Sequence, residues 1–183
     1  IANAISSYIR SLVALNSRFD LYMRGDERKL NNKEKKGFNL FMGKAKCGTC
    51  HFIPLFNGLT PPFFGDSESE VLGVPQTKNK NPVTQDPDKG KFNFTRSPYS
   101  SLSVQNPHAA KYCTNCTIYA NGVYNTLEEI MEFYNNGGGK GLHIAPENQT
   151  LPLNKLHLSK KEINNIISFL KTLTDTTTTT QLH

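Results

Sequence analysis

The chain has 183 residues, of which 37% are hydrophobic and 20% charged, and its net charge at pH 7 is +6. This length suits one well-buried domain and is short for two. The Lys and Arg residues are scattered among Asp and Glu, with no basic helix and no aromatic platform beside a basic run, which argues against nucleic-acid binding. No stretch of the sequence is long and apolar enough to span a membrane.

The first residues predict a helix that runs to about Tyr22, because its apolar residues are spaced to share one helical face. These residues are Ile5, Ile9, Leu12 and Val13. The chain opens at Ile1 inside this pattern, with no initiator methionine and no signal peptide before it. We therefore interpret it as a piece of a longer exported protein.

A second helix is predicted to begin near Asn31, where the run Leu30-Asn31-Asn32-Lys33-Glu34 suits an N-cap, and to end at Gly43. Residues 54–93 hold most of the prolines and predict a long, loop-rich excursion. The predicted fold class is therefore all-α, with long loops that could wrap a cofactor.

Two more helices are predicted in the last third of the chain. Thr126-Leu127-Glu128-Glu129 has the capping-box pattern, and its helix should continue through Tyr134 to the glycines at 137–139. Leu158-Ser159-Lys160-Lys161-Glu162 has the same pattern and begins a final helix. The residues that should face inward from this last helix are Ile163, Ile166, Ile167, Leu170 and Leu173. Residues 176–183 are predicted to form a disordered tail.

The central motif is Cys47-Gly48-Thr49-Cys50-His51, which has the C-x-x-C-H spacing of a c-type haem attachment site. The two thiols can add across the haem vinyl groups while the adjacent imidazole binds the iron. Apolar residues on both sides of the motif could cover the porphyrin, and Phe38, Phe41, Phe56 and Leu127 are the candidates.

Two other cysteines leave alternatives open. Cys113-Thr114-Asn115-Cys116 is a second C-x-x-C, so all four thiols could hold a structural Zn²⁺ ion as a Cys₄ module. A disulfide between Cys113 and Cys116 is another alternative. The zinc interpretation is weakened because more than sixty residues separate the two pairs, and because it leaves His51 without a role.

Beyond the haem motif, several blocks resemble the second haem domain of bacterial dihaem cytochrome c peroxidases, and the resemblance covers nearly the whole chain. The matching blocks are LNSRFD at 15–20, LEE at 127–129, FYNNGGG at 133–139, NQTLP at 148–152 and ISFLKTLT at 167–174. The resemblance implies an interdomain linker helix over residues 1–26 and a cytochrome c domain over 27–175, wrapped around one covalent haem.

One segment departs from the family. Where the family carries a stretch like FKTPTLRNIALTAPYMHNG, with its methionine as the distal iron ligand, this sequence has unrelated letters from Val104 to Ala120. Permitted codons for these residues give FKTPTLRNIALTAPYM when they are translated one base later. We therefore interpret residues 99–120 as a compensated frameshift, either a sequencing error or a real lesion in the gene.

The two cases differ at the distal ligand. In the case of an error, the protein carries Tyr119→Met, and Cys113 and Cys116 do not exist in it. In the case of a real lesion, Tyr119 stands at the ligand position, and tyrosinate would favour ferric iron. Position 119 is the second candidate iron ligand in both cases, opposite His51.

In this family, the N-terminal haem reduces hydrogen peroxide, and the C-terminal haem passes electrons to it from a small donor such as a cytochrome c or a cupredoxin. The resemblance therefore implies a high-potential electron-transfer haem c, a missing N-terminal haem domain, a periplasmic location, and Ca²⁺ and a homodimer in the intact protein. A monohaem electron shuttle stays open, as does a tyrosine-ligated dihaem oxidase relative.

Overall fold

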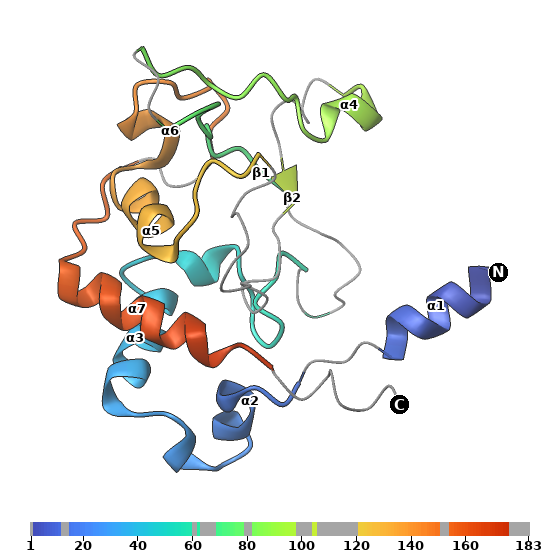
Figure 1. Ribbon diagram of the computed structural model, residues 1–183, viewed down its shortest axis with the longest axis vertical. Helices are drawn as coiled ribbons and strands as arrows, with labels where there is room; N and C mark the ends of the chain where they lie inside the picture. Colours follow the sequence, from blue (N-terminus) through green and yellow to red (C-terminus); the bar gives the residue numbers. More distant parts are fainter. Residues whose placement is uncertain are drawn as a thin grey trace.

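The computed structural model describes residues 2–11, 15–59, 62, 69–78, 82–97, 104–105, 121–150 and 154–175. The described part is mainly helical (Figure 1). Its helices are α1 (Ala2–Ser11), α2 (Arg18–Met23), α3 (Asn32–Met42), α4 (Phe92–Thr95), α5 (Leu127–Asn135), α6 (Gly138–Gly141) and α7 (Lys160–Thr172). Two 3₁₀ turns, η1 (Glu27–Lys29) and η2 (Cys47–Thr49), and two antiparallel strands, β1 (Ser69–Glu70) and β2 (Val104–Gln105), complete it.

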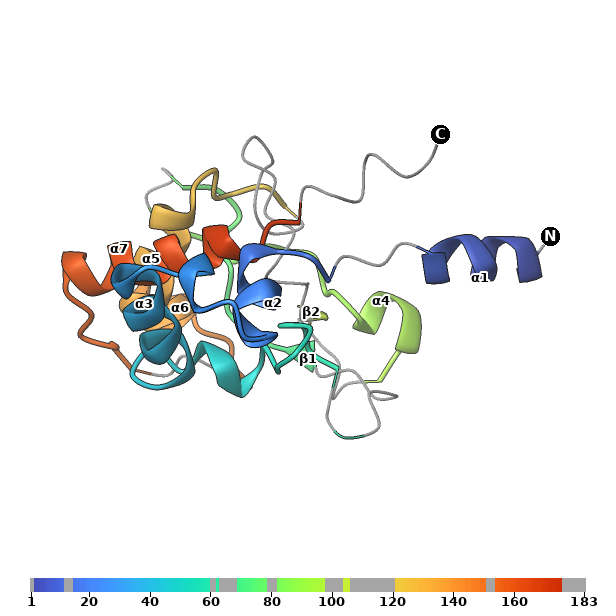
Figure 2. The same ribbon diagram turned by 90° about the horizontal axis from the view of Figure 1, so that it is seen from below.

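Helices α3 and α7 pack against each other, and this pair is the main helix contact of the fold (Figures 1 and 2). The two backbones approach closely at Gly37, where an added Cβ would lie 2.0 Å from the main-chain oxygen of Asn165. Only a residue without a side chain permits this approach. Helix α5 in turn contacts α7, and η2 follows α3 after residues 43–46.

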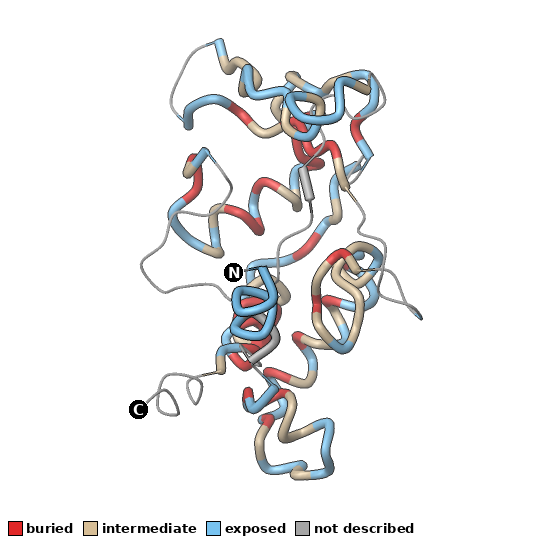
Figure 3. Tube along the Cα trace, turned by 90° about the vertical axis from the view of Figure 1, so that its right-hand side faces the viewer, coloured by how far each residue is buried: buried red, intermediate tan, exposed pale blue. Residues whose placement is uncertain are grey.

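An aromatic cluster fills the space beside this helix pair. Phe169 on α7 is fully buried, and its ring lies 5.3 Å from the rings of Phe19, Phe38 and Phe41. Phe56 joins the cluster at 5.2 Å from Phe19. Tilted and edge-on contacts of this kind add to the free energy of burial. Figure 3 marks the buried residues in red along the Cα trace. The buried aliphatic residues around it include Leu30, Leu158, Ile166, Ile167, Leu170 and Leu173.

The predicted caps of α3 and α7 are confirmed. Asn31 and Ser159 accept hydrogen bonds from the first-turn amides, and Glu34 and Glu162 accept bonds from the cap residues in return. Thr126 is the N-cap of α5 as predicted, and its side chain accepts a hydrogen bond from the amide of Glu129. The Glu129 carboxylate, however, accepts from the amide of Asn125, one residue before the cap.

The prediction of a single opening helix that runs to about Tyr22 is wrong. Helix α1 ends at Ser11, Leu15 and Asn16 are not helical, and α2 begins after Ser17. The Ser17 side chain accepts from the amide of Asp20 and the Asp20 carboxylate accepts from the amide of Ser17, which is a complete capping box. A new helix start of this strength separates residues 1–26 into two helices.

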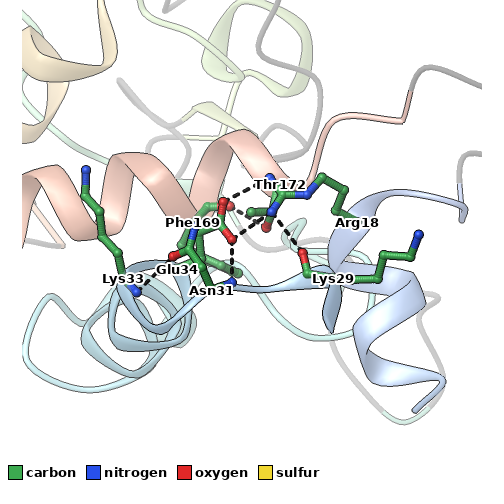
Figure 4. A network of polar contacts seen from close by, with 7 residues as sticks. All are labelled: Arg18, Lys29, Asn31, Lys33, Glu34, Phe169 and Thr172. Atoms are coloured by element: carbon green, nitrogen blue, oxygen red, sulfur yellow. Dashed lines mark hydrogen bonds and ion pairs between the residues drawn. The ribbon is translucent and has the colours of Figure 1, made fainter. Parts of the chain in front are cut away.

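A bidentate ion pair fixes α2 to α3 (Figure 4). Arg18 donates to the two carboxylate oxygens of Glu34 at 2.9 and 2.8 Å and to the main-chain oxygen of Lys29 at 2.9 Å. The Glu34 carboxylate also accepts from the amide of Asn31 at 2.8 Å. The Glu34 side chain is only 8% exposed, so these hydrogen-bond donors replace water in stabilising its negative charge.

Replacing Arg18 is therefore expected to destabilise the fold. Because Arg18 is half exposed and Glu34 keeps the Asn31 amide, we expect Arg18→Met to cost about 2 kcal/mol, below the range for a fully buried pair. Urea unfolding measures the change. Arg28→Met is the control, because its ion pair with Asp26 is exposed and its loss should leave the urea midpoint unchanged. Equal effects of the two substitutions would contradict this account.

A second ion pair links the start of α7 to the end of α3. Lys44 donates to both oxygens of Glu162 at 2.9 Å, and the amide and hydroxyl of Ser159 donate to the same carboxylate. These donors, Lys44 first, lower the pKa of Glu162 from 4.5 to about 2.

This lowered pKa predicts how stability depends on pH. The contribution of ionised Glu162 is complete above pH 4.5 and is lost as the pH falls toward 2, because the unfolded chain takes up the proton first. The difference in Tm between the native chain and Glu162→Gln should therefore shrink over this range. Thermal unfolding by circular dichroism tests it, and a difference that stays constant from pH 7 to pH 2 would refute the prediction.

Residues 71–75 and the glycine-rich segment after α5 hold each other through main-chain contacts. Gly139 donates to the oxygen of Leu72, and Gly73 and Gly139 are so close that neither could carry a Cβ. Gln149 is buried beside them, donates to Gly137 and accepts from the amide of Lys140. The predicted end of α5 at these glycines is confirmed, with the short α6 immediately after it. No helix within the described ranges could cross a membrane.

Candidate haem site

The C-x-x-C-H motif lies in a tight turn directly after α3. Residues Cys47 to Thr49 form η2, and the amides of Cys50 and His51 both donate to the main-chain oxygen of Cys47, at 3.2 and 2.9 Å. This turn brings the two cysteines and the histidine into one short, ordered segment. Phe41 on α3 and Ala45 just after it are buried in the core and anchor the turn.

The imidazole of His51 is oriented by the main chain. Its Nδ1 lies 3.1 Å from the main-chain oxygen of Phe56. Since a carbonyl oxygen only accepts, the neutral imidazole that makes this bond carries its proton on Nδ1 and its lone pair on Nε2. Histidines that bind metal ions are typically fixed in this way by a second hydrogen bond. His51 therefore has the tautomer that a proximal iron ligand requires.

Phe56 adopts an unusual backbone conformation to supply that oxygen. Its φ of 49° lies in the left-handed region, which bulky residues rarely occupy. A hydrogen bond from its amide to the oxygen of Phe52 closes the loop, and its side chain is buried in the aromatic cluster. Strained residues of this kind concentrate at functional sites. Burial of the Phe56 side chain in the core thus stabilises the left-handed backbone conformation that places its carbonyl oxygen next to His51.

The two cysteines face different surroundings. Cys47 packs against the hydrophobic core, and burial raises the pKa of its thiol to about 12. Cys50 lies toward β1, where its thiol donates to Oε1 of Glu70 over 3.5 Å. Among the described residues, no three His, Cys, Asp or Glu side chains gather to form a metal-binding cluster.

The structure places the other predicted site residues as follows. Phe41 is nearest the imidazole, with ring centroids 6.2 Å apart, and Phe56 contacts His51 through its carbonyl oxygen. Phe38 is partly buried and contacts the cluster at Phe19 and Phe169, and Leu127 packs on the same core from the start of α5. Tyr119, Cys113 and Cys116 lie outside the described residues, and so do residues 176–183.

Two features of the site were missed from the sequence. Phe169 is the centre of the aromatic cluster, and its place three residues after Ile166 on the same helical face could have indicated it. Glu70 beside Cys50 belongs to no motif, and only the path of the loop brings it there.

These features fit a covalently attached haem. Both thiols lie in one short segment, the imidazole presents the correct nitrogen, and the buried ring of Phe41 lies beside it. The residues that would hold this haem are Cys47, Cys50 and His51, the three that the motif predicts. The apolar groups that adjoin His51 most directly are Phe41 and Phe56.

Comparison with known proteins gives a consistent result. No protein-family model matches the chain. The chain is 26% identical to Cytochrome-c peroxidase IdrP2 of Denitromonas iodatirespirans, over 92% of the chain and 47% of that protein. It is 29% identical to Cytochrome c551 peroxidase of Nitrosomonas europaea, over 95% of the chain and 44% of that protein.

Among solved structures, a MauG-like protein associated with microbial copper homeostasis matches with a TM-score of 0.77 and 23% identity, over 98% of this chain and 58% of that one. This match confirms the predicted all-α cytochrome c fold. The chain spans about half the length of the curated relatives it matches.

Proposed function

Because the chain is homologous to the bacterial dihaem cytochrome c peroxidases and MauG proteins, we propose that it is the electron-transfer haem domain of such an enzyme. Cys47 and Cys50 bind one haem c covalently, and His51 is the proximal ligand of its iron. The bound haem would supply one-electron chemistry between Fe(III) and Fe(II).

The observation that carries this proposal is the hydrogen bond between His51 Nδ1 and the Phe56 carbonyl oxygen. It leaves the lone pair of the neutral imidazole on Nε2, through which His51 would bind the haem iron, and it would strengthen the imidazole as a donor. The buried side chains of Phe41 and Phe56 would exclude water from this side of a bound haem, which would favour the less charged, reduced form and so raise its potential. Phe38 and Leu127 extend the apolar wall.

Position 119 is the proposed distal ligand. If residues 99–120 are a misread segment, the protein carries Tyr119→Met, and thioether ligation gives a high potential. Tryptic peptide mass spectrometry distinguishes the cases. We expect a peptide that contains TAPYM, and a peptide that contains Cys113 as written would show that the printed segment is real.

The activity proposed for the intact protein is the reduction of hydrogen peroxide to water. This chain would accept electrons from a small donor, a cytochrome c or a cupredoxin, and pass them to an N-terminal haem domain where peroxide binds. A periplasmic location fits, because haem is attached to such motifs outside the cytoplasm. A homodimer and a bound Ca²⁺ ion belong to the same proposal, with ligands that the described residues do not identify.

A second candidate is a tyrosine-ligated oxidase relative. It is favoured only by Tyr119 as written, since tyrosinate stabilises ferric iron. A monohaem shuttle would have the same His51 side, and a Cys₄ zinc module would bind no haem.

Optical spectra and a peroxide assay on the intact gene product separate these functions. We expect a reduced-minus-oxidised spectrum typical of haem c and peroxide reduction that depends on an added donor. A haem spectrum without peroxidase activity would favour the shuttle, and tyrosinate ligation with substrate oxidation would favour the oxidase. A protein that contains zinc and no haem would refute all three haem functions.

A further inference from the structure

The carboxylate of Glu70 lies beside one of the two thiols of the haem motif. Cys50 donates from Sγ to Oε1 of Glu70 over 3.5 Å, although the two residues are 20 positions apart in the chain. Both side chains are half-buried. Cys47, in contrast, donates to the main-chain oxygen of Ala45 and packs on the hydrophobic core. The two attachment points of the motif therefore differ, because one is apolar and the other borders a carboxylate.

The main chain around Glu70 directs this side chain toward the motif. The amide of Val71 donates to the hydroxyl of Thr150 at 3.0 Å, and the amide of Thr150 donates to the main-chain oxygen of Val71 at 2.9 Å. Neighbouring side chains of a strand point to opposite faces. In β1, Ser69 accordingly accepts from Lys91 over 3.4 Å on one face, while Glu70 points to the motif on the other. The contact with the motif therefore follows from the backbone of β1.

The charge of Glu70 is not neutralised by an ion pair within the described part of the chain. The ion pairs of the described residues all involve other carboxylates. Haem attachment also removes the thiol proton of Cys50, because the S–H group adds across a haem vinyl group, with the sulfur bonded to one carbon and the hydrogen to the other. A carboxylate without a cationic partner would then border the thioether at the edge of the haem.

We propose that Glu70 lowers the reduction potential of the haem and so opposes the effect of the apolar residues beside His51. A negative charge stabilises Fe(III) more than Fe(II), because the ferric haem carries one more positive charge. Buried Phe41 and Phe56 act in the opposite sense from the side of His51. This inference rests on the proposed function, in which the haem passes electrons to a second haem. The lower potential increases the driving force for that transfer.

Spectroelectrochemical titration at pH 7 of the protein with haem attached tests this role. Glu70→Gln keeps the shape of the side chain and removes its charge. Through an effective dielectric constant of about 20, one charge beside the haem changes the equilibrium constant for reduction by roughly tenfold. The midpoint potential should therefore rise by about 59 mV, which is the one-electron equivalent of a factor of ten. Glu70→Lys reverses the charge and should raise the midpoint by about twice as much.

Glu27→Gln is the matched control, because it makes the same change of charge at an exposed position in η1. Its midpoint should equal that of the native protein. Midpoints of Glu70→Gln and Glu70→Lys that match the native value, fall below it or rise by equal amounts would overturn the proposal, since an effect of charge requires graded steps. A native chain without haem would refute the proposed function and this inference together. Haem with an unmoved potential would refute only the role of Glu70.

Discussion

Replacing both Cys47 and Cys50 with serine should abolish covalent haem in the protein. The two thiols are the only groups of the motif that can form thioether bonds, and His51 alone would bind haem reversibly. The aromatic core beside His51 also loses a large apolar partner, so the variant should be less stable. Haem staining after denaturing electrophoresis measures the loss, with expression in cells that attach haem c.

The matched control is the pair Cys113→Ser and Cys116→Ser. If these residues exist as printed, the haem interpretation predicts that the stain is retained, because their spacing lacks the adjacent histidine. A Cys₄ zinc site predicts the opposite behaviour. Loss of zinc from both double variants, with no haem in the native chain, would contradict the haem assignment.

A single methyl group added at Gly37 should strongly destabilise the fold. Helix propensity alone favours Gly37→Ala by about 1 kcal/mol. The added Cβ would, however, lie 2.0 Å from the Asn165 oxygen and 2.8 Å from Cβ of Phe169, so α3 and α7 must move apart. We expect a net loss of about 3 kcal/mol in the free energy of unfolding, at the upper end for an overpacked core.

Urea unfolding of Gly37→Ala against Lys36→Ala gives the cleanest comparison. Lys36 is the preceding residue of α3 and is exposed, so its replacement changes the helix without touching α7. The Lys36→Ala variant should have nearly the same urea midpoint of unfolding as the native protein. A Gly37→Ala variant as stable as the control would show that the close crossing of α3 and α7 is not present in solution.

Local sequence signals predicted much of the helical framework. The capping pairs at Asn31 and Ser159 fixed the starts of α3 and α7, because a cap is set by residues within one turn of each other. The same rule applied to Ser17 and Asp20 would have divided the opening helix. The regular spacing of the apolar residues favoured one continuous helix, although Ser17 and Asp20 already indicate the start of α2.

The sequence predicts the candidate ligands of the site, but it predicts their surroundings only in part. The motif names Cys47, Cys50 and His51 by spacing alone. The left-handed backbone of Phe56 was not predictable, because no glycine or asparagine marks the position. Likewise, Glu70 reaches Cys50 across a loop, and such contacts depend on the tertiary path of the chain.

Intact-protein mass spectrometry under denaturing conditions tests the central claim most directly. The chain, expressed where haem c is attached, should have a mass that exceeds its polypeptide mass by one haem, and the added mass should disappear in the Cys47→Ser, Cys50→Ser variant. A native chain that shows only its polypeptide mass, and that carries no haem absorption before denaturation, would contradict the account.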